Sequence, residues 1–317
     1  MKFEYRPALP TDSSRYATPL TAPSPSGISV TFLGVATLLI TDGVTSLLTD
    51  GFFTRPGIFG MLTRVKPQPA IIDKCLRRSG IHRLDAVLVG HSHYDHSMDS
   101  GVVAARTGAT LVGSDSTLEI GVGAGLSESA MQRVTPGEPL RFGRFTVTML
   151  LSEHAPGAKF PGLIERPLHA PARIGAYRMA EVYSMVIEHD ANGTHPRRML
   201  VHGSAGFRPE MLAGHPVDIA YLGIGTLGKQ PDDYLDEYWA QTVAATHAQT
   251  AIPIHWDDFT RALDRPMVPF PSVADDFTRS FGYLRRRGTE AGVSVLLQRP
   301  WEVVDPFGQH PRQTAAR

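Results

Sequence analysis

The sequence contains almost no cysteine and has no excess of charge of either sign. Its single cysteine, Cys75, excludes a disulfide within the chain and argues against a structural zinc site, which is usually rich in cysteine. Lysine and arginine together number 31, and aspartate and glutamate also number 31, so no overall positive field would attract nucleic acid. We therefore expect neither a disulfide-stabilised scaffold nor a nucleic-acid-binding protein.

Long hydrophobic runs are also missing. No apolar run reaches the roughly 18 residues that a membrane-spanning helix needs, and residues 1–7 contain no apolar core of signal-peptide length. We therefore expect no membrane span and a cytoplasmic location. The 317 residues, of which 42% are hydrophobic and 20% charged, are enough for one large α/β domain with a substantial core. Nothing in the sequence indicates an oligomeric state.

The most informative segment is the hexapeptide His-Ser-His-Tyr-Asp-His that begins at His91. It follows an apolar run, residues 84–90, which predicts a buried strand ending in a turn. His91 and His93 occupy alternate positions, so an extended backbone would direct both imidazoles toward one point. Asp95 and His96 follow where the chain turns and can face a neighbouring point. Neutral imidazole and carboxylate suit zinc and related divalent ions, so the segment predicts a metal site with room for two ions.

The hexapeptide resembles the signature of the metallo-β-lactamase superfamily, which is His-x-His-x-Asp-His after a strand. Three more stretches match the family's pattern in the same order, and they centre on Asp50, His154 and His255. The resemblance extends over residues 28–297. It implies an αββα sandwich of two mixed β-sheets flanked by helices, and the activity of a metal-dependent hydrolase.

The pattern of apolar residues and turns divides the chain into three parts. We expect an extended N-terminal arm at 1–27, a hydrolase domain at 28–305 and a polar C-terminal tail at 306–317. The predicted strands are residues 28–33, 36–40, 45–49, 84–90, 109–113, 145–151, 182–188, 198–202, 218–223, 251–254 and 293–297. The predicted helices are residues 70–79, 97–108 and 232–248, with a fourth inside 272–292.

The resemblance also implies a set of metal ligands. A first metal would be held by three histidines, and a second by one aspartate and two histidines; they are His91, His93 and His154, and Asp95, His96 and His255. Zinc is the expected ion, one or two per chain, with Mn²⁺ or Fe²⁺ as alternatives. Two such ions roughly 3.5–4 Å apart can share a hydroxide and polarise a substrate oxygen. Asp95 is the expected catalytic residue, because it could also handle a proton during turnover.

The chain departs from the family pattern at one position. Dinuclear members usually carry a bridging aspartate at the end of a strand after the third histidine, and Ser204 occupies that place here. Because a neutral serine binds zinc less well than a carboxylate, the second metal should be held more weakly or be bridged by hydroxide alone. His202 has the same strand parity as Ser204, so it could lean toward the site or be a satisfied structural residue.

Four more residues are candidates for supporting roles. Asp50 is expected to orient a metal ligand, as carboxylates behind a ligand often do. Tyr94, inside the hexapeptide, could pack or donate a hydrogen bond to substrate. Asp257 and Asp258 directly follow His255. They could bond a ligating imidazole, face the substrate, or belong to a solvated turn.

Two long connections lie beside the motifs. The first, residues 53–83, is unusually apolar at its start, through Phe52, Phe53, Ile58, Phe59, Met61 and Leu62. We expect these side chains to cover the core, with a wall of the substrate pocket as the alternative. Basic residues in the same region, Arg64, Lys66, Lys74, Arg77 and Arg78, are expected to form a solvated helix face. The second connection, residues 155–180, is rich in proline and begins beside His154, which favours a lid or substrate loop.

The expected function is hydrolysis of an ester, lactone or phosphodiester bond in a small-molecule or lipid-like substrate. The tyrosine in the hexapeptide, the long insertion and the His-Trp-Asp-Asp ending are most similar to one branch of the superfamily. That branch contains ascorbate-phosphate lactonases and phospholipase-D-like enzymes that cleave N-acyl phosphatidylethanolamine.

Three alternatives remain. A nuclease of the same superfamily is disfavoured by the zero net charge. A β-lactamase is disfavoured because no export signal is visible. A metal-binding or ligand-sensing protein with a degenerate site is supported only by Ser204.

Overall fold

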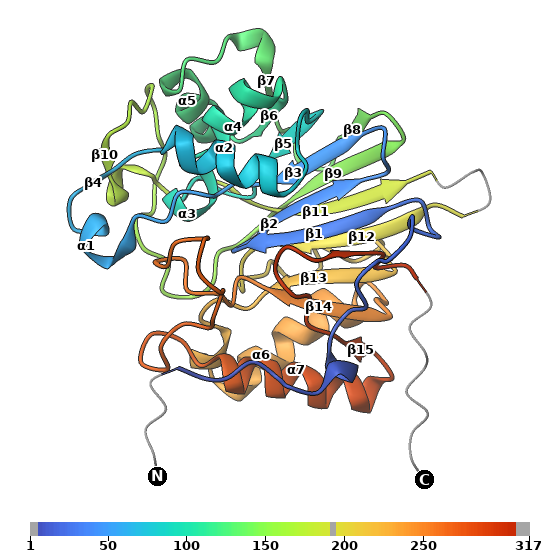
Figure 1. The fold of residues 1–317 in the computed structure, drawn as a ribbon. Coiled ribbons are helices and arrows are strands. Elements are labelled where there is room, and N and C mark those ends of the chain that lie inside the picture. Colours follow the sequence, from blue (N-terminus) through green and yellow to red (C-terminus); the bar gives the residue numbers. More distant parts are fainter. Residues whose placement is uncertain (1–5, 191–194, 309–317) are drawn as a thin grey trace.

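The computed structural model describes residues 6–190 and 195–308. Within these ranges, two seven-stranded mixed sheets lie face to face, and helices cover the outer face of each (Figure 1). The predicted αββα sandwich is therefore confirmed. The helices above the first sheet come from the first half of the chain, and those below the second sheet come from the last third (Figure 1).

The first sheet has the strand order β16-β1-β2-β3-β5-β6-β7. Its strands are β1 (Ser29–Gly34), β2 (Thr37–Thr41), β3 (Ser46–Thr49), β5 (Ala86–Leu88), β6 (Thr110–Gly113), β7 (Met131–Arg133) and β16 (Val303–Val304). Pairing is antiparallel from β16 to β3 and parallel from β3 to β7. The covering helices are α2 (Pro69–Arg78), α4 (Ser100–Thr107) and α5 (Asp115–Gly123). Strands β1, β2 and β3 are buried on both faces because they lie between these helices and the other sheet.

The second sheet has the order β15-β14-β13-β12-β11-β9-β8. Its strands are β8 (Pro139–Phe142), β9 (Phe145–Ser152), β11 (Val182–His189), β12 (Arg197–His202), β13 (Ile219–Gly223), β14 (Thr250–Ile254) and β15 (Ser294–Val295). Pairing is antiparallel from β8 to β12 and parallel from β12 to β15. Helices α6 (Asp232–Trp239) and α7 (Phe277–Ala291) cover its outer face (Figure 1).

Most predicted elements are found within one or two residues, but three are corrected. The predicted helix 232–248 is α6 followed by a π-helical turn, Ala240–Ala244. The predicted strand 293–297 keeps only the two residues of β15. The predicted helix 97–108 is divided into α3 (Tyr94–Ser97) and α4, so a helix already begins inside the hexapeptide.

The smaller elements lie in the connections between the main strands and helices and in the N-terminal arm. They are α1 (Gly57–Met61), the two-stranded ribbon of β4 (Arg64–Val65) and β10 (Ala172–Arg173), and 3-10 turns at Ser13–Arg15, Glu128–Ala130, Ile174–Ala176 and Leu227–Lys229. The ribbon joins the two long connections to each other, because Arg64 pairs with Arg173 and Val65 with Ala172. Sequence periodicity could not predict these two-residue strands.

The described part of the N-terminal arm packs along the domain. Ala17 is buried and donates its N–H to the carbonyl of Leu297 at 3.1 Å. Arg6 reaches Asp258, with 2.6 Å between Nη2 and Oδ2. Of the expected tail, residues 309–317 lie outside the described ranges. In the part of the chain that is described, no helix has both the length and the apolar character needed to cross a membrane.

The predicted site residues follow the carboxyl ends of strands from both sheets. Asp50 comes directly after β3, His91 shortly after β5 and His154 shortly after β9, while Ser204 follows β12 and His255 follows β14. Because these ends meet along one edge of the sandwich, residues more than 200 positions apart in the sequence are brought together there. This edge is where open α/β sheets generally bind ligands.

The two sheets are joined at this edge through Val35, which follows β1. Its carbonyl accepts the N–H of His255 at 2.7 Å, and its own N–H donates to Asp257 Oδ1 at 2.7 Å. The other carboxylate oxygen of Asp257 lies 2.9 Å from Arg55 Nη1, and both side chains are almost fully buried. The buried ion pair therefore fixes the turn that carries His255.

Replacing Asp257 with alanine should lower the free energy of unfolding by about 3–5 kcal/mol, because it leaves the buried Arg55 guanidinium without its partner. Urea denaturation measures this change. The control is Arg133→Ala, which removes the exposed ion pair of Arg133 with Asp115 and should cost less than about 1 kcal/mol. Equal losses in the two variants would contradict the role given to the buried pair.

Candidate metal centre

The hexapeptide divides into an extended part and a helical part. His91 lies in the extended segment after β5, and His93 is the N-cap of α3 with extended backbone angles. Asp95 and His96 then lie in the first turn of α3 rather than in a simple turn. The change from extended to helical backbone directs the first pair of side chains to one point and the second pair to another.

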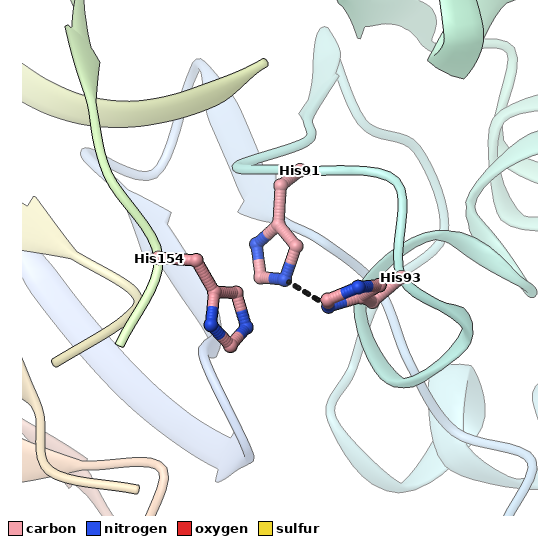
Figure 2. A group of neighbouring side chains, drawn as sticks. All are labelled: His91, His93 and His154. Carbon is pink, nitrogen blue, oxygen red and sulfur yellow. Dashed lines mark hydrogen bonds between the residues drawn. The ribbon is translucent and has the colours of Figure 1, made fainter. Parts of the chain in front are cut away.

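Three histidines form the first group. His91 Nε2 lies 3.1 Å from His93 Nδ1, and the ring of His154 is 5.0 Å from that of His91 and 4.9 Å from that of His93. Figure 2 shows the three rings converging, with His154 contributed by the segment after β9. One nitrogen from each ring lies within 4.8 Å of the others, so these residues could hold a metal ion.

Asp95, His96 and His255 form the second group. His255 Nε2 lies 3.3 Å from His96 Nε2 and 3.6 Å from Asp95 Oδ2. One ligand atom from each residue again lies within 4.8 Å of the others. The two groups adjoin each other, since the rings of His91 and His96 are only 3.9 Å apart. Each group could therefore hold a metal ion.

Three of the histidines donate a hydrogen bond from the ring nitrogen that points away from the group; they are His93, His154 and His96. His93 donates from Nε2 to the carbonyl of Lys159 at 2.7 Å, and His154 donates from Nδ1 to that of Ala155 at 3.0 Å. His96 donates from Nδ1 to Asp50 Oδ2 at 2.6 Å. Each bond fixes the tautomer and leaves the opposite nitrogen's lone pair directed into the group, as metal-binding imidazoles require.

Burial and neighbouring charges set the protonation of the groups. Burial lowers the pKa of His91 well below its usual value, and it lowers that of His93 as well and that of His154 to about 4. The first group is therefore neutral near pH 7 and able to bind a cation.

In the second group, neighbouring charges outweigh burial in setting the pKa of Asp95 and of His96. For Asp95, burial is outweighed by His96 and His255, which lower its pKa. For His96, burial is outweighed by Asp50 and Asp95, which raise its pKa. A cation entering this group competes with a proton on His96.

Asp50 holds both the strand end and the ring of His96. Besides the bond to His96, its Oδ1 accepts the N–H of Gly90 at 2.8 Å, directly before the hexapeptide. Its backbone adopts a left-handed conformation, with φ of 55°, which is uncommon for a residue other than glycine. The Asp50 carboxylate therefore contacts His96, one of the predicted metal ligands, so it can orient that imidazole.

A cavity of about 430 Å³ opens beside the two groups. His93, Asp95, His154 and His255 contribute to its wall. The rest is mainly apolar, with Met61, Tyr94, Phe160, Ile174, Phe259 and Phe270 as the large side chains. The start of the 155–180 connection forms part of this lining, which is the position expected of a substrate loop.

Tyr94 and Ser204 both line the cavity. The Tyr94 hydroxyl is 2.9 Å from Met61 Sδ, and its ring makes edge contacts with Phe52 and Phe259, so the residue packs the wall. The Ser204 hydroxyl accepts the N–H of Ala155 at 3.0 Å, next to His154. The serine therefore lies beside the histidine groups, at the edge where the family pattern has an aspartate.

Three other candidates have contacts that lead away from the imidazoles. Asp257 and Asp258 are buried, so the alternative of a solvated turn is wrong for both. Asp257 bonds Val35 and Arg55, and Asp258 bonds Arg6 and Thr260, so the carboxylates hold the turn rather than a ligating ring. His202 Nδ1 lies 2.6 Å from Ser184 Oγ and its ring packs on Tyr238 of α6, on the outer face of the sheet. Parity along the strand was therefore a poor guide for His202.

The apolar insertion does not behave as one unit. Phe52 and Phe53 are buried, as expected for core cover, and Met61 lines the cavity. Ile58, Phe59 and Leu62 are exposed, so the expectation that they cover the core is wrong.

The basic residues of the same region do not all lie on one helix. Arg64 and Lys66 lie on and after β4, and only Lys74, Arg77 and Arg78 belong to helix α2.

Two glycines at the site were missed in the sequence. A Cβ on Gly206 would lie 2.2 Å from the carbonyl oxygen of His154, and one on Gly225 would lie 2.9 Å from His255 Nδ1. Both positions need glycine because the backbone passes directly against a histidine of the site. Gly225 belongs to a glycine-rich loop after β13, and that composition was the only signal available.

Comparison with known proteins identifies relatives over most of the chain. Residues 45–256 match the family described as "Beta-lactamase superfamily domain". The chain is 24% identical over 254 residues to a UPF0173 metal-dependent hydrolase of Heliobacterium modesticaldum, covering 80% of this chain and 92% of that protein.

Two solved structures share the fold. Igni18, a metallo hydrolase from Ignicoccus hospitalis, has a TM-score of 0.57 at 15% identity, over 87% of this chain and 97% of the other. The metallo-β-lactamase fold protein YhfI from Bacillus subtilis has a TM-score of 0.50 at 15% identity, over 87% of this chain and 98% of the other.

Replacing Asp50 with asparagine should weaken metal binding by the Asp95, His96 and His255 group by about 10- to 100-fold, because His96 loses the carboxylate that orients it. Competition with a chromogenic chelator measures the affinity. Asp42→Asn is the matched control, since Asp42 also pairs with a buried histidine, His189, at 3.0 Å but away from both groups. Equal metal affinity in the two variants would show that Asp50 does not position a ligand.

Proposed function

The chain belongs to the metallo-β-lactamase superfamily and is a metal-dependent hydrolase. We propose that it cleaves an ester, lactone or phosphodiester bond in a lipid-like substrate. The observation that carries the substrate class is the apolar cavity that opens directly onto the two histidine groups. A substrate with an acyl or alkyl group would bury that group there and present its polar bond to the groups.

We assign the metal ligands to the residues that converge. His91, His93 and His154 would hold one ion, and Asp95, His96 and His255 a second. Zinc is the ion we propose, since imidazole and carboxylate suit it, and manganese or iron are the alternatives. When bound, such ions polarise a substrate oxygen and lower the pKa of water to near neutrality.

Asp95 is proposed to combine two roles. Its carboxylate lies among imidazoles and also lines the cavity, so it can face both a ligand group and a substrate. Because His96 and His255 keep its pKa low, it stays ionised, as a carboxylate that binds a cation must, and it would quickly pass on any proton received during turnover. Tyr94 and Phe259 close the wall beside it by packing together, which limits the access of water.

The serine at position 204 is expected to make the two metal positions unequal. The first group offers three neutral imidazoles. In the second group the raised pKa of His96 lets a proton compete with the ion, and residue 204 supplies no bridging carboxylate. We therefore expect one tightly held and one weakly held ion per chain.

Replacing His93 or His154 with alanine should reduce bound metal and turnover together. Turnover should fall by about 100-fold or more, because a catalytic ion stabilises the transition state by several kcal/mol. Elemental analysis gives the metal content. Turnover is measured on nitrophenyl esters of increasing acyl length, on an acyl lactone and on bis-nitrophenyl phosphate.

His82→Ala, at an exposed histidine outside both groups, is the control and should keep metal and activity. A preference for longer acyl chains supports the lipid-like substrate. Preference for short, highly charged substrates would contradict the role of the apolar cavity. Full activity of His93→Ala or His154→Ala would refute the ligand assignment.

Replacing Ser204 with aspartate should tighten the second metal position. The new carboxylate could still accept the N–H of Ala155 while adding a negative ligand beside the histidines. Isothermal titration with zinc should then show a second high-affinity event that the natural protein and Ser204→Ala lack. Identical titrations of all three proteins would mean that residue 204 does not reach the bridging position.

A further inference from the structure

One short helix exposes a cluster of large apolar side chains. On α1 and the residue after it, Ile58 is 58% exposed, Phe59 85% and Leu62 79%. Ile58 and Leu62 are four residues apart and Phe59 and Leu62 three apart, so they share one side of the helix. Exposed apolar side chains are common singly, but three on one turn of helix form a contiguous patch, which is typical of a binding surface.

The patch is continuous with the wall of the substrate cavity. Met61, on the same helix, lines the cavity and touches the hydroxyl of Tyr94 at 2.9 Å. The chain then enters β4, which pairs with β10 of the connection that begins after His154 (Figure 1). The helix that carries the apolar patch therefore also contributes a side chain to the wall of the cavity.

Basic residues predominate in the two stretches next to the patch although the whole chain has a formal net charge of zero. The two stretches that meet in the β4–β10 ribbon, residues 57–68 and 156–178, contain Glu165 as their only acidic residue. Their basic residues are all exposed, and they are Arg64, Lys66, Lys159, Arg166, Arg173 and Arg178. Arg64 and Arg173 are direct partners in the ribbon, so two like charges lie on neighbouring strands. Arg64 donates to the carbonyl of Pro171 at 3.2 Å, and among the described residues neither arginine forms an ion pair with a carboxylate. Such a pair favours an anionic partner.

We propose that α1 and the β4–β10 ribbon dock the enzyme on an anionic lipid surface. Ile58, Phe59 and Leu62 would enter the boundary between head groups and acyl chains, and Arg64, Lys66 and Arg173 would contact the head groups. We call these six residues the mouth surface. A role of the mouth surface in catalysis rests on the proposed lipid-like substrate. Such a substrate could pass from the lipid surface into the cavity along Met61.

The combination of residues favours lipid over two other partners. A second copy of this chain would bring the same basic residues face to face, which costs Coulomb energy. A nucleic acid would satisfy the charges but would leave the three apolar side chains of α1 without a partner. An anionic bilayer satisfies both kinds of side chain at once.

The experiment measures binding of the full-length protein to vesicles by co-sedimentation. One set of vesicles contains only phosphatidylcholine, and the other contains phosphatidylcholine with one third phosphatidylglycerol. We expect tighter binding to the anionic vesicles and weaker binding at high salt. The triple variant Ile58→Ser, Phe59→Ser, Leu62→Ser should bind anionic vesicles at least about tenfold more weakly.

A second variant tests the charges separately. Arg64→Glu with Lys66→Glu should also weaken binding at least about tenfold and remove its salt dependence, since each basic residue near the surface adds to the attraction. The matched controls are Val44→Ser and Arg77→Glu. Val44 is 89% exposed in the β2–β3 turn, and Arg77 is an exposed basic residue of α2. Both controls should bind as the natural protein does.

Four results would overturn the proposal. The first two are no binding to anionic vesicles and equal binding of the variants and the natural protein. The third is a dimer in sedimentation that the triple variant abolishes, which would indicate a second copy as the partner. The fourth is displacement from vesicles by a short oligonucleotide at low concentration, which would indicate a nucleic acid.

Failure of docking and failure of the proposed function can be told apart. Hydrolysis of a water-soluble long-chain ester without vesicle binding would reject docking alone. Vesicle binding without any hydrolysis would reject the proposed substrate class alone.

Discussion

The backbone of Val35 connects the two sheets at the edge that carries the histidines, and the site depends on this connection. His255 comes from the second sheet, whereas His96 follows the first. The Val35 carbonyl accepts the N–H of His255 and the Val35 N–H donates to Asp257, so these bonds hold the turn with His255 against the end of β1. Val35 and His255 both have positive φ, 52° and 57°, which costs about 1–3 kcal/mol each. The buried pair of Arg55 and Asp257 offsets this strain, so a conformation that local preferences disfavour is held in place by contacts distant in sequence.

The sequence was most informative where chemistry is concentrated in a few neighbouring residues. The spacing within the hexapeptide was enough to place His91 and His93 at one point and Asp95 and His96 at another, because strand and helix geometry are local. The layered fold was implied by the resemblance to a known family, and the order of the predicted strands and helices was compatible with it. His154 and His255 could be chosen among thirteen histidines only through the order of motifs in a known family.

Sequence reasoning failed where the contact partner is distant in sequence. Nothing near Asp257 shows that its partners are Val35 and Arg55, so its burial could not be foreseen. The apolar start of the 53–83 connection was interpreted as one unit, yet it divides between core, cavity wall and solvent within ten residues.

Overall composition also failed to show where the charged residues lie. A net charge of zero conceals a stretch around the β4–β10 ribbon that is strongly basic, because composition says nothing about where charges gather.

The strands at the borders of the two sheets share one property. β16 and β15 have two residues each, β7 has three, and β8 has four and begins with a proline, which lacks an N–H to donate. A foreign strand that tried to extend either sheet would find only a few unpaired backbone groups. The sandwich is therefore protected against growth into β-aggregates, and an enzyme of this design can keep an apolar entrance open without presenting a template for self-assembly.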